Sequence, residues 1–112
     1  MIKKKRKNPL LHKINNIKYE IIDPPVYDEE KLIRKFSEII TKKFNIIKNK
    51  IPLIVFKHLK TSDGMIYFDS ETDLVSHIEL NSEGDNINNY MLRILFHELG
   101  HFIFDDFLSE KS

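Results

Sequence analysis

The sequence predicts a small α+β domain in which one helix precedes a three-stranded sheet and a second helix closes the chain. Three observations predict it. A capped amphipathic helical pattern spans 28–47, three short β-type segments separated by turn residues fill 51–80, and a helical apolar pattern occupies the last part of the chain. A length of 112 residues allows one domain. We expect a single domain over 1–112, with a compact core over 28–104.

The composition is that of an ordinary folded protein, with 41% hydrophobic and 31% charged residues. The absence of cysteine excludes disulfides, thiol catalysis, iron–sulfur clusters and cysteine zinc sites. A basic run, Lys3 to Lys7, opens the chain, and we expect residues 1–8 to form a flexible basic tail. Asn8, His12 and Lys13 interrupt any signal-peptide apolar region, so we expect a cytoplasmic protein with no membrane partner.

The charge is strongly divided along the chain although the formal net charge is only +1. Up to Lys60 there are 16 Lys and Arg against 6 Asp and Glu, whereas from Thr61 onward there are 2 against 11. Such halves can satisfy each other's charges when they pack, and this is the interpretation we favour. A basic face for nucleic acid is the less favoured alternative.

The first structured segment is ambiguous. Residues Pro9 to Ile22 have apolar side chains at a weak helical spacing that equally allows a short strand over 19–22. Pro24-Pro25 then breaks the chain. Asp28 is a predicted N-cap, because acidic residues follow it in the first turn and apolar residues then recur every three or four positions up to Ile47.

Three strands are predicted next. The segment 51–59 is apolar and β-branched at its start, and Asp63-Gly64 marks a turn before a second strand over 65–68. Residues Val75 to Leu80 alternate apolar and polar side chains, as a half-exposed strand does. The polar stretch 81–89 supplies turn residues before a helix from about Ile87 to Phe104 or beyond.

This last helix carries an HExxH motif, formed by His97, Glu98 and His101. Two histidines four residues apart lie on one helix face, so both imidazoles can bind one metal ion, for which Zn²⁺ is the expected choice. Glu98 lies about 100° round the helix from His97. From there it can act as a general base on an activated water and then pass the proton to a leaving amine.

The packing of this helix supports a functional role for the histidines. An apolar stripe is expected to face the core on the side away from them: Leu92, Leu95, Leu99, Phe102 and Ile103. The histidines would then face a cleft flanked by Tyr90, Ile94 and Asp105. Two surface histidines and a glutamate on an ordinary amphipathic helix are the structural alternative.

The stretch Arg93 to Ile103, RILFHELGHFI, resembles the active-site helix of zincin metallopeptidases. Its HELGH form is most similar to ImmA/IrrE-type proteins, and minimal gluzincin-like and SprT-like domains resemble it also. The resemblance implies a zinc-dependent peptidase whose strand before the active-site helix binds extended peptide by strand addition. That role would fall on Val75 to Leu80, with substrate contacts from five of its residues: Val75, His77, Ile78, Glu79 and Leu80.

The resemblance also implies a third zinc ligand downstream, and eleven residues follow His101. Asp106 or Glu110 is the favoured ligand if the chain turns back after Phe104. Asp105, four residues past His101, suits a carboxylate that accepts the Nδ1–H of a ligating histidine. The histidines of the strand region, His58 and His77, or a partner subunit in a homodimer, are alternative sources.

Peptide hydrolysis also needs a donor for the oxyanion, and Tyr67, His77 and Tyr90 are the candidates. The sequence therefore predicts a zinc metallopeptidase acting on a peptide or protein. The alternative from another class is a truncated zincin-like module that binds metal, has little catalytic activity and serves as a regulator or sensor. A nucleic-acid-binding protein with a coincidental HExxH is a third, less favoured possibility.

Overall fold

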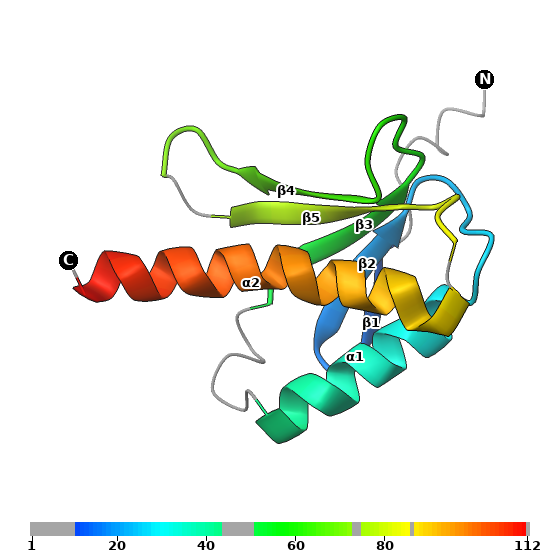
Figure 1. Cartoon of the computed structure of the whole chain (residues 1–112), viewed down its shortest axis with the longest axis horizontal. Helices are drawn as coiled ribbons and strands as arrows, with labels where there is room; N and C mark the ends of the chain where they lie inside the picture. Colours follow the sequence, from blue (N-terminus) through cyan, green and yellow to red (C-terminus); the bar gives the residue numbers. More distant parts are fainter. Residues whose placement is uncertain (1–10, 44–50, 73–74, 86, 112) are drawn as a thin grey trace.

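The computed structural model describes residues 11–43, 51–72, 75–85 and 87–111, and their side chains except at 43, 75 and 101–111. These residues form a mixed sheet with two helices on one face (Figure 1). The strands are β1 (Leu11–Ile14), β2 (Ile17–Ile21), β3 (Leu53–Lys57), β4 (Gly64–Phe68) and β5 (Val75–Asn81). The helices are α1 (Glu29–Lys43) and α2 (Tyr90–Lys111), and a 3₁₀ turn, η3 (Ile87–Asn89), precedes α2. The α+β class is confirmed.

The prediction of three strands is wrong, because the sheet has five strands in the order β1-β2-β3-β5-β4. The two extra strands form an antiparallel hairpin in which Ile14 pairs with Ile17. Its two-residue turn consists of Asn15 and Asn16, with φ of 50° and 73°. Positive φ at both positions is the requirement of a type I′ turn, and asparagine tolerates it better than most residues. The short-range turn chemistry therefore outweighs the weak helical spacing of the apolar residues.

Helix α1 begins as predicted. The Asp28 carboxylate accepts a hydrogen bond from the Lys31 backbone N–H at 3.0 Å, which is the N-cap contact, and Glu29 and Glu30 occupy the first turn. The helix ends at Lys43 in the structure. The predicted extension to Ile47 lies outside the described residues.

The three predicted strands between 51 and 80 are confirmed as β3, β4 and β5 within a few residues at their ends. Strand β3 is parallel to both β2 and β5, whereas β4 is antiparallel to β5. Within the described sheet, β4 is an edge strand and β5 an interior one. This order determines which strand has backbone groups available for a further partner.

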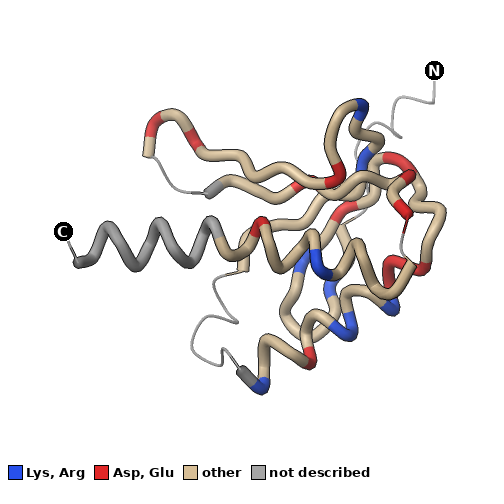
Figure 2. Tube along the Cα trace, in the orientation of Figure 1, with Lys and Arg blue, Asp and Glu red and all other residues tan. Residues whose placement is uncertain are grey.

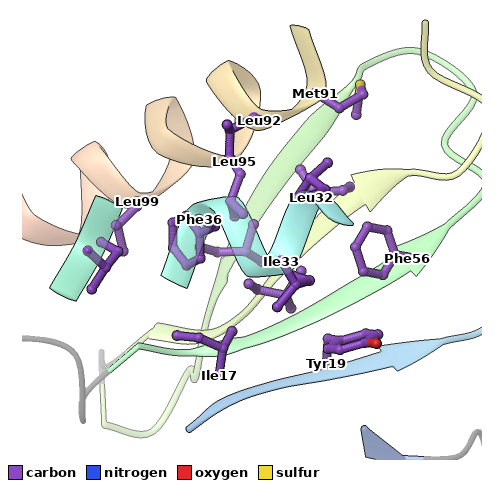
Figure 3. Close-up of a cluster of buried hydrophobic side chains, with 14 residues drawn as sticks. Ile17, Tyr19, Leu32, Ile33, Phe36, Phe56, Met91, Leu92, Leu95 and Leu99 are labelled. Atoms are coloured by element: carbon purple, nitrogen blue, oxygen red, sulfur yellow. The ribbon is translucent and has the colours of Figure 1, made fainter. Parts of the chain in front are cut away.

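One face of the sheet and both helices enclose the core (Figure 3). The largest fully buried side chains come from every layer: Phe36, Phe56, Ile17, Ile33, Ile40, Ile54, Ile78, Leu80, Met91, Leu95 and Leu99. Because strand side chains alternate, the intervening residues of β3, β4 and β5 point to the opposite face, here called the rear face. No helix within the described part of the chain is long and apolar enough to span a membrane.

Candidate metal centre

The HExxH motif lies inside one uninterrupted helix, because α2 runs from Tyr90 to Lys111. His97 and His101 are therefore one turn apart on a single helix face, as the motif requires. The backbone of both is described, whereas the side chain of His101 lies outside the described side chains. The predicted first turn, from Ile87, is the separate 3₁₀ segment η3.

The orientation of α2 agrees with the predicted apolar stripe. Leu92, Leu95 and Leu99 are buried against the sheet and α1, and His97 is exposed. The side chains of Phe102 and Ile103 lie outside the described ones. The first histidine of the motif therefore stands on the solvent side of a helix whose other side is fixed in the core.

Glu98 is buried, with only 8% of its surface exposed, and it lies against the start of β4. A Cβ atom at position 64 would stand 3.3 Å from the Glu98 Cγ and 3.4 Å from its Oε2. The same atom would come within 2.7 Å of the Ile94 Cγ2, a distance that side chains do not tolerate. Gly64 therefore lets the strand approach the helix closely. Sequence reasoning predicts only a turn at Gly64, and no local signal marks it as the residue facing Glu98.

Within the described sheet, the edge of β4 beside Glu98 has no strand paired to it. The Asn81 N–H donates to the Asp63 carbonyl at 2.9 Å, so Asp63 faces β5 with its backbone groups. In an antiparallel ladder these directions alternate, so the backbone groups of Gly64 and Ile66 point outward, away from β5. The outward edge thus begins at the residue that contacts Glu98.

The expectation that Val75 to Leu80 takes an added strand is wrong. This segment is β5, which from His77 onward pairs with β3 on one side and β4 on the other, so its backbone groups there are already bonded within the sheet. Ile78 and Leu80 are fully buried in the core, where no substrate reaches them. Of these two strands, β4 is the one that lies at an edge of the described sheet.

His77 and Glu79 of β5 lie on the rear face together with Tyr67 of β4. We name these three residues the rear cluster. The rings of Tyr67 and His77 stack with centroids 4.7 Å apart, and His77 Nε2 lies 3.2 Å from Glu79 Oε2. Burial and the Glu79 carboxylate raise the pKa of the Tyr67 hydroxyl. Since α2 packs on the other face, the rear cluster supplies neither a zinc ligand nor an oxyanion donor beside Glu98.

Tyr90 lies at the start of α2, two turns before Glu98. Its hydroxyl donates to Asp63 Oδ2 at 3.0 Å, which ties the helix to the residue before β4. This hydrogen bond and the charge of Asp63 raise the pKa of Tyr90. Eight residues of helix span about 12 Å, so Tyr90 braces the helix against the strand rather than donating to a group at Glu98.

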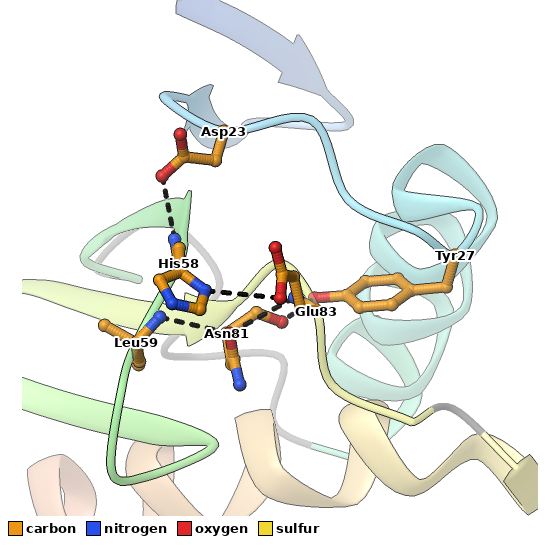
Figure 4. A network of polar contacts seen from close by, with 6 residues as sticks. All are labelled: Asp23, Tyr27, His58, Leu59, Asn81 and Glu83. Atoms are coloured by element: carbon orange, nitrogen blue, oxygen red, sulfur yellow. Dashed lines mark hydrogen bonds and ion pairs between the residues drawn. The ribbon is translucent and has the colours of Figure 1, made fainter.

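His58 belongs to a polar network where β3 and β5 end (Figure 4). Its ring lies 3.5 Å from Glu83 Oε1, and its backbone N–H donates to Asp23 at 2.9 Å. Asn81 Oδ1 accepts the backbone N–H groups of Leu59 and Glu83 nearby. These contacts give His58 a role in holding the loops together.

Helix α2 continues through Lys111, so the chain does not turn back after Phe104. In a continuous helix, positions 106 and 110 fall about 140° and 180° round from His101, whereas Asp105 falls about 40° away. The helical backbone therefore does not favour Asp106 or Glu110 as the third ligand. The side chains of all three lie outside the described ones.

Among the side chains that the structure describes, which in α2 end at Gly100, no group of three or more His, Asp and Glu is arranged to hold a metal ion. Comparison of the chain with protein-family models, with curated proteins and with solved structures finds no match.

Proposed function

We propose that this chain is a zinc-dependent metallopeptidase whose metal is held by His97 and His101 and whose general base is Glu98. One observation carries the proposal. The HExxH motif lies in a single helix, and its glutamate is buried directly beside the free edge of the sheet. A motif arising by chance on a solvent-facing helix has no reason to place its glutamate there.

The donor set suits zinc. Imidazole nitrogens are among its preferred ligands, and the spacing of His97 and His101 places both on one helix face. Bound zinc would supply Lewis-acid activation of a water molecule. His97 is exposed, so the metal side of the helix is open to solvent and substrate.

Glu98 would do the proton chemistry. Its carboxylate would take a proton from the water whose oxygen attacks the peptide carbonyl carbon, and deliver that proton to the amide nitrogen as the C–N bond breaks. Contacts with Gly64 and burial against β4 hold the side chain in place. Such fixed positioning is what a proton-transfer group needs.

The substrate would bind as an extended strand along β4. Main-chain hydrogen bonds to the outward groups of Gly64 and Ile66 would hold it, and they are independent of substrate sequence. Because Gly64 also contacts Glu98, this strand would pass directly in front of the general base. The substrate-binding strand is thus β4 in place of β5.

A metal-binding module with little catalytic activity is the second candidate. The continuation of α2 through Lys111 favours it, since the motif itself provides two protein ligands and a catalytic zinc site ordinarily has three. Both candidates require zinc at α2 and differ in whether Glu98 turns over substrate.

The test is Glu98→Gln against a matched Glu83→Gln control. Glu83 is exposed in the loop after β5. Zinc content, circular dichroism and cleavage of a fluorogenic peptide library are measured on both. The peptidase proposal predicts that Glu98→Gln retains metal and fold and loses about 10²–10⁴-fold in cleavage rate, while Glu83→Gln cleaves like wild type. Zinc binding with no cleavage by wild type would favour the metal-binding module.

A further inference from the structure

The strand that receives the substrate in the proposed function belongs to a region with acidic charge only. We name residues 61–92 the acidic lobe, because the sequence has no Lys or Arg between Lys60 and Arg93. Its described acidic residues are Asp63, Asp69, Glu71, Glu79, Glu83 and Asp85. Figure 2 shows acidic residues round the β4–β5 hairpin, which has no basic ones, whereas α1 carries residues of both signs.

Within the described residues, no Lys or Arg forms an ion pair with the acidic lobe. Within the described residues, the ion pairs of the structure both involve a histidine, in His58–Glu83 and in His77–Glu79. No described Lys or Arg has its side-chain nitrogen within 4.0 Å of a described carboxylate oxygen. The expected mutual satisfaction of the two halves is thus not achieved through direct pairs there. Four of the lobe's acidic residues are exposed to solvent: Asp69, Glu71, Glu83 and Asp85.

Acidic residues of the lobe lie at both ends of β4. Asp63 immediately precedes the strand, and Asp69 and Glu71 follow it. Asp69 and Glu71 are exposed, and Asp69 Oδ1 accepts the Glu71 backbone N–H at 2.8 Å, which fixes the turn that carries them. A strand added along β4 would therefore have carboxylates near both of its ends.

Between these ends, β4 has apolar side chains exposed to solvent. Met65 is 42% exposed, Tyr67 38% and Phe68 47%. Apolar side chains with an acidic surround match a ligand that is apolar in its middle and basic at its ends. Arg93, the first basic residue in sequence after the lobe, lies exposed on α2.

We propose that the edge of β4 selects extended peptides with Lys or Arg on both sides of a short apolar stretch. This inference rests on the proposed function, since it names the substrate class of that site. Main-chain bonds to Gly64 and Ile66 provide attachment in any sequence. The acidic lobe provides the selection, because opposite charges speed association and like charges oppose it.

The experiment measures binding, so it does not depend on hydrolysis. Three fluorescent nine-residue peptides share one apolar centre and differ in their flanks, which are lysine, serine or glutamate. Binding to the zinc-loaded Glu98→Gln protein is followed by anisotropy. We expect the lysine peptide to bind at least about tenfold more tightly than the glutamate peptide, with the difference shrinking in 0.5 M NaCl, because salt screens exposed charges.

Two variants locate the effect. Asp69→Lys/Glu71→Lys should reduce the lysine preference by about tenfold, as loss of several rim charges does. Arg34→Glu/Lys42→Glu is the matched control on α1, where both residues are exposed, and it should leave the preference unchanged. N-methylation of alternate peptide nitrogens should abolish binding, because it removes the donors of an added strand.

Equal binding of lysine and glutamate peptides, an unchanged preference in Asp69→Lys/Glu71→Lys, or binding of none of the peptides would each overturn the inference. A second copy of the chain on β4 would appear as a dimer by light scattering that excludes the peptides, and this would overturn it also. Charge-selective binding without any cleavage by wild type would instead keep the selection and overturn the peptidase activity alone.

Discussion

Two buried glutamates, Glu98 on α2 and Glu79 on β5, each have a histidine near them in the sequence. Glu79 is 7% exposed and Glu98 8%, so the two do not differ in burial. They differ in the residues that they contact. On the strand, His77 and Glu79 are two residues apart, share a face and contact each other at 3.2 Å. On the helix, His97 precedes Glu98 directly, and Glu98 packs instead against Gly64 of another element.

The difference shows how backbone period decides what a His–Glu combination does. In a strand, the side chains of His77 and Glu79 point to the same face and contact each other, so the imidazole and one carboxylate oxygen are already engaged. The other oxygen, Glu79 Oε1, is buried and has no hydrogen-bond partner among the described residues. A helix separates neighbours by about 100°, so histidine and glutamate serve different directions. His77 and Glu79 therefore contact each other within the sheet, whereas His97 and Glu98 point in different directions from α2.

The largest expected effect comes from replacing His77 and His97, one at a time, by alanine. His77→Ala leaves the buried Glu79 carboxylate without its partner, so we expect a loss of about 2–3 kcal/mol in the free energy of unfolding. His97→Ala, at an exposed position, should change it by less than about 0.5 kcal/mol when both proteins are zinc-free. Urea denaturation in the presence of a chelator measures both. Equal losses would show that the two histidines have similar structural roles.

Alanine substitutions at two glycines, Gly64 and Gly100, test how closely β4 packs against α2 beside Glu98. Gly64→Ala adds a Cβ that meets the Ile94 side chain at 2.7 Å, so we expect a loss of about 1–2 kcal/mol. Gly100→Ala, whose added Cβ meets nothing within 4 Å, should gain about 0.5–1 kcal/mol from helix propensity. Thermal unfolding of the two variants is the measurement. A neutral Gly64→Ala would mean that the strand and helix are less tightly packed at Glu98.

The smallest effect concerns the tyrosines of the two regions, Tyr90 in front and Tyr67 in the rear cluster. Each has a pKa raised above 10.0, chiefly by Asp63 for Tyr90 and by burial for Tyr67. The folded state therefore holds these protons more strongly. The stabilisation is complete below pH 10 and is lost as the pH rises through the folded pKa values.

Carbon-13 NMR titration of labelled tyrosine Cζ atoms resolves the two hydroxyls. Asp63→Asn should return the pKa of Tyr90 toward 10.0, because it removes the main cause of the shift, and should leave Tyr67 unchanged. A Tyr90 pKa that stays raised in Asp63→Asn would contradict the bond between the helix and the residue before β4.

Much of the fold can be predicted from local sequence patterns, because each pattern spans only a few residues. Asp28 and the apolar spacing after it predict α1, and the alternation of 75–80 predicts β5. The hairpin was missed because Asn15-Asn16 is a turn signal that two short apolar runs obscure. Strand order was beyond reach, since the pairing of β3 with β5 depends on contacts between distant residues.

The candidate site likewise has a part that the local sequence predicts and a part that depends on distant residues. The helix period alone places His97 and His101 on one face, so their predicted arrangement depends on nothing distant. The contact of Glu98 with Gly64, and the role of β4 as the edge, join residues more than thirty positions apart and needed the folded chain. The rear position of His77 likewise follows from which face of β5 the helices cover.

The most direct test of the central claim is the zinc content of purified protein, measured by elemental analysis on wild type and on His97→Ala, with His77→Ala as the matched control. Zinc held by His97 and His101 predicts about one zinc per chain in wild type and in His77→Ala, and loss of most of it in His97→Ala, because a single remaining imidazole loses the chelate. Unchanged zinc in His97→Ala, or none in wild type after refolding with excess zinc, would contradict the account.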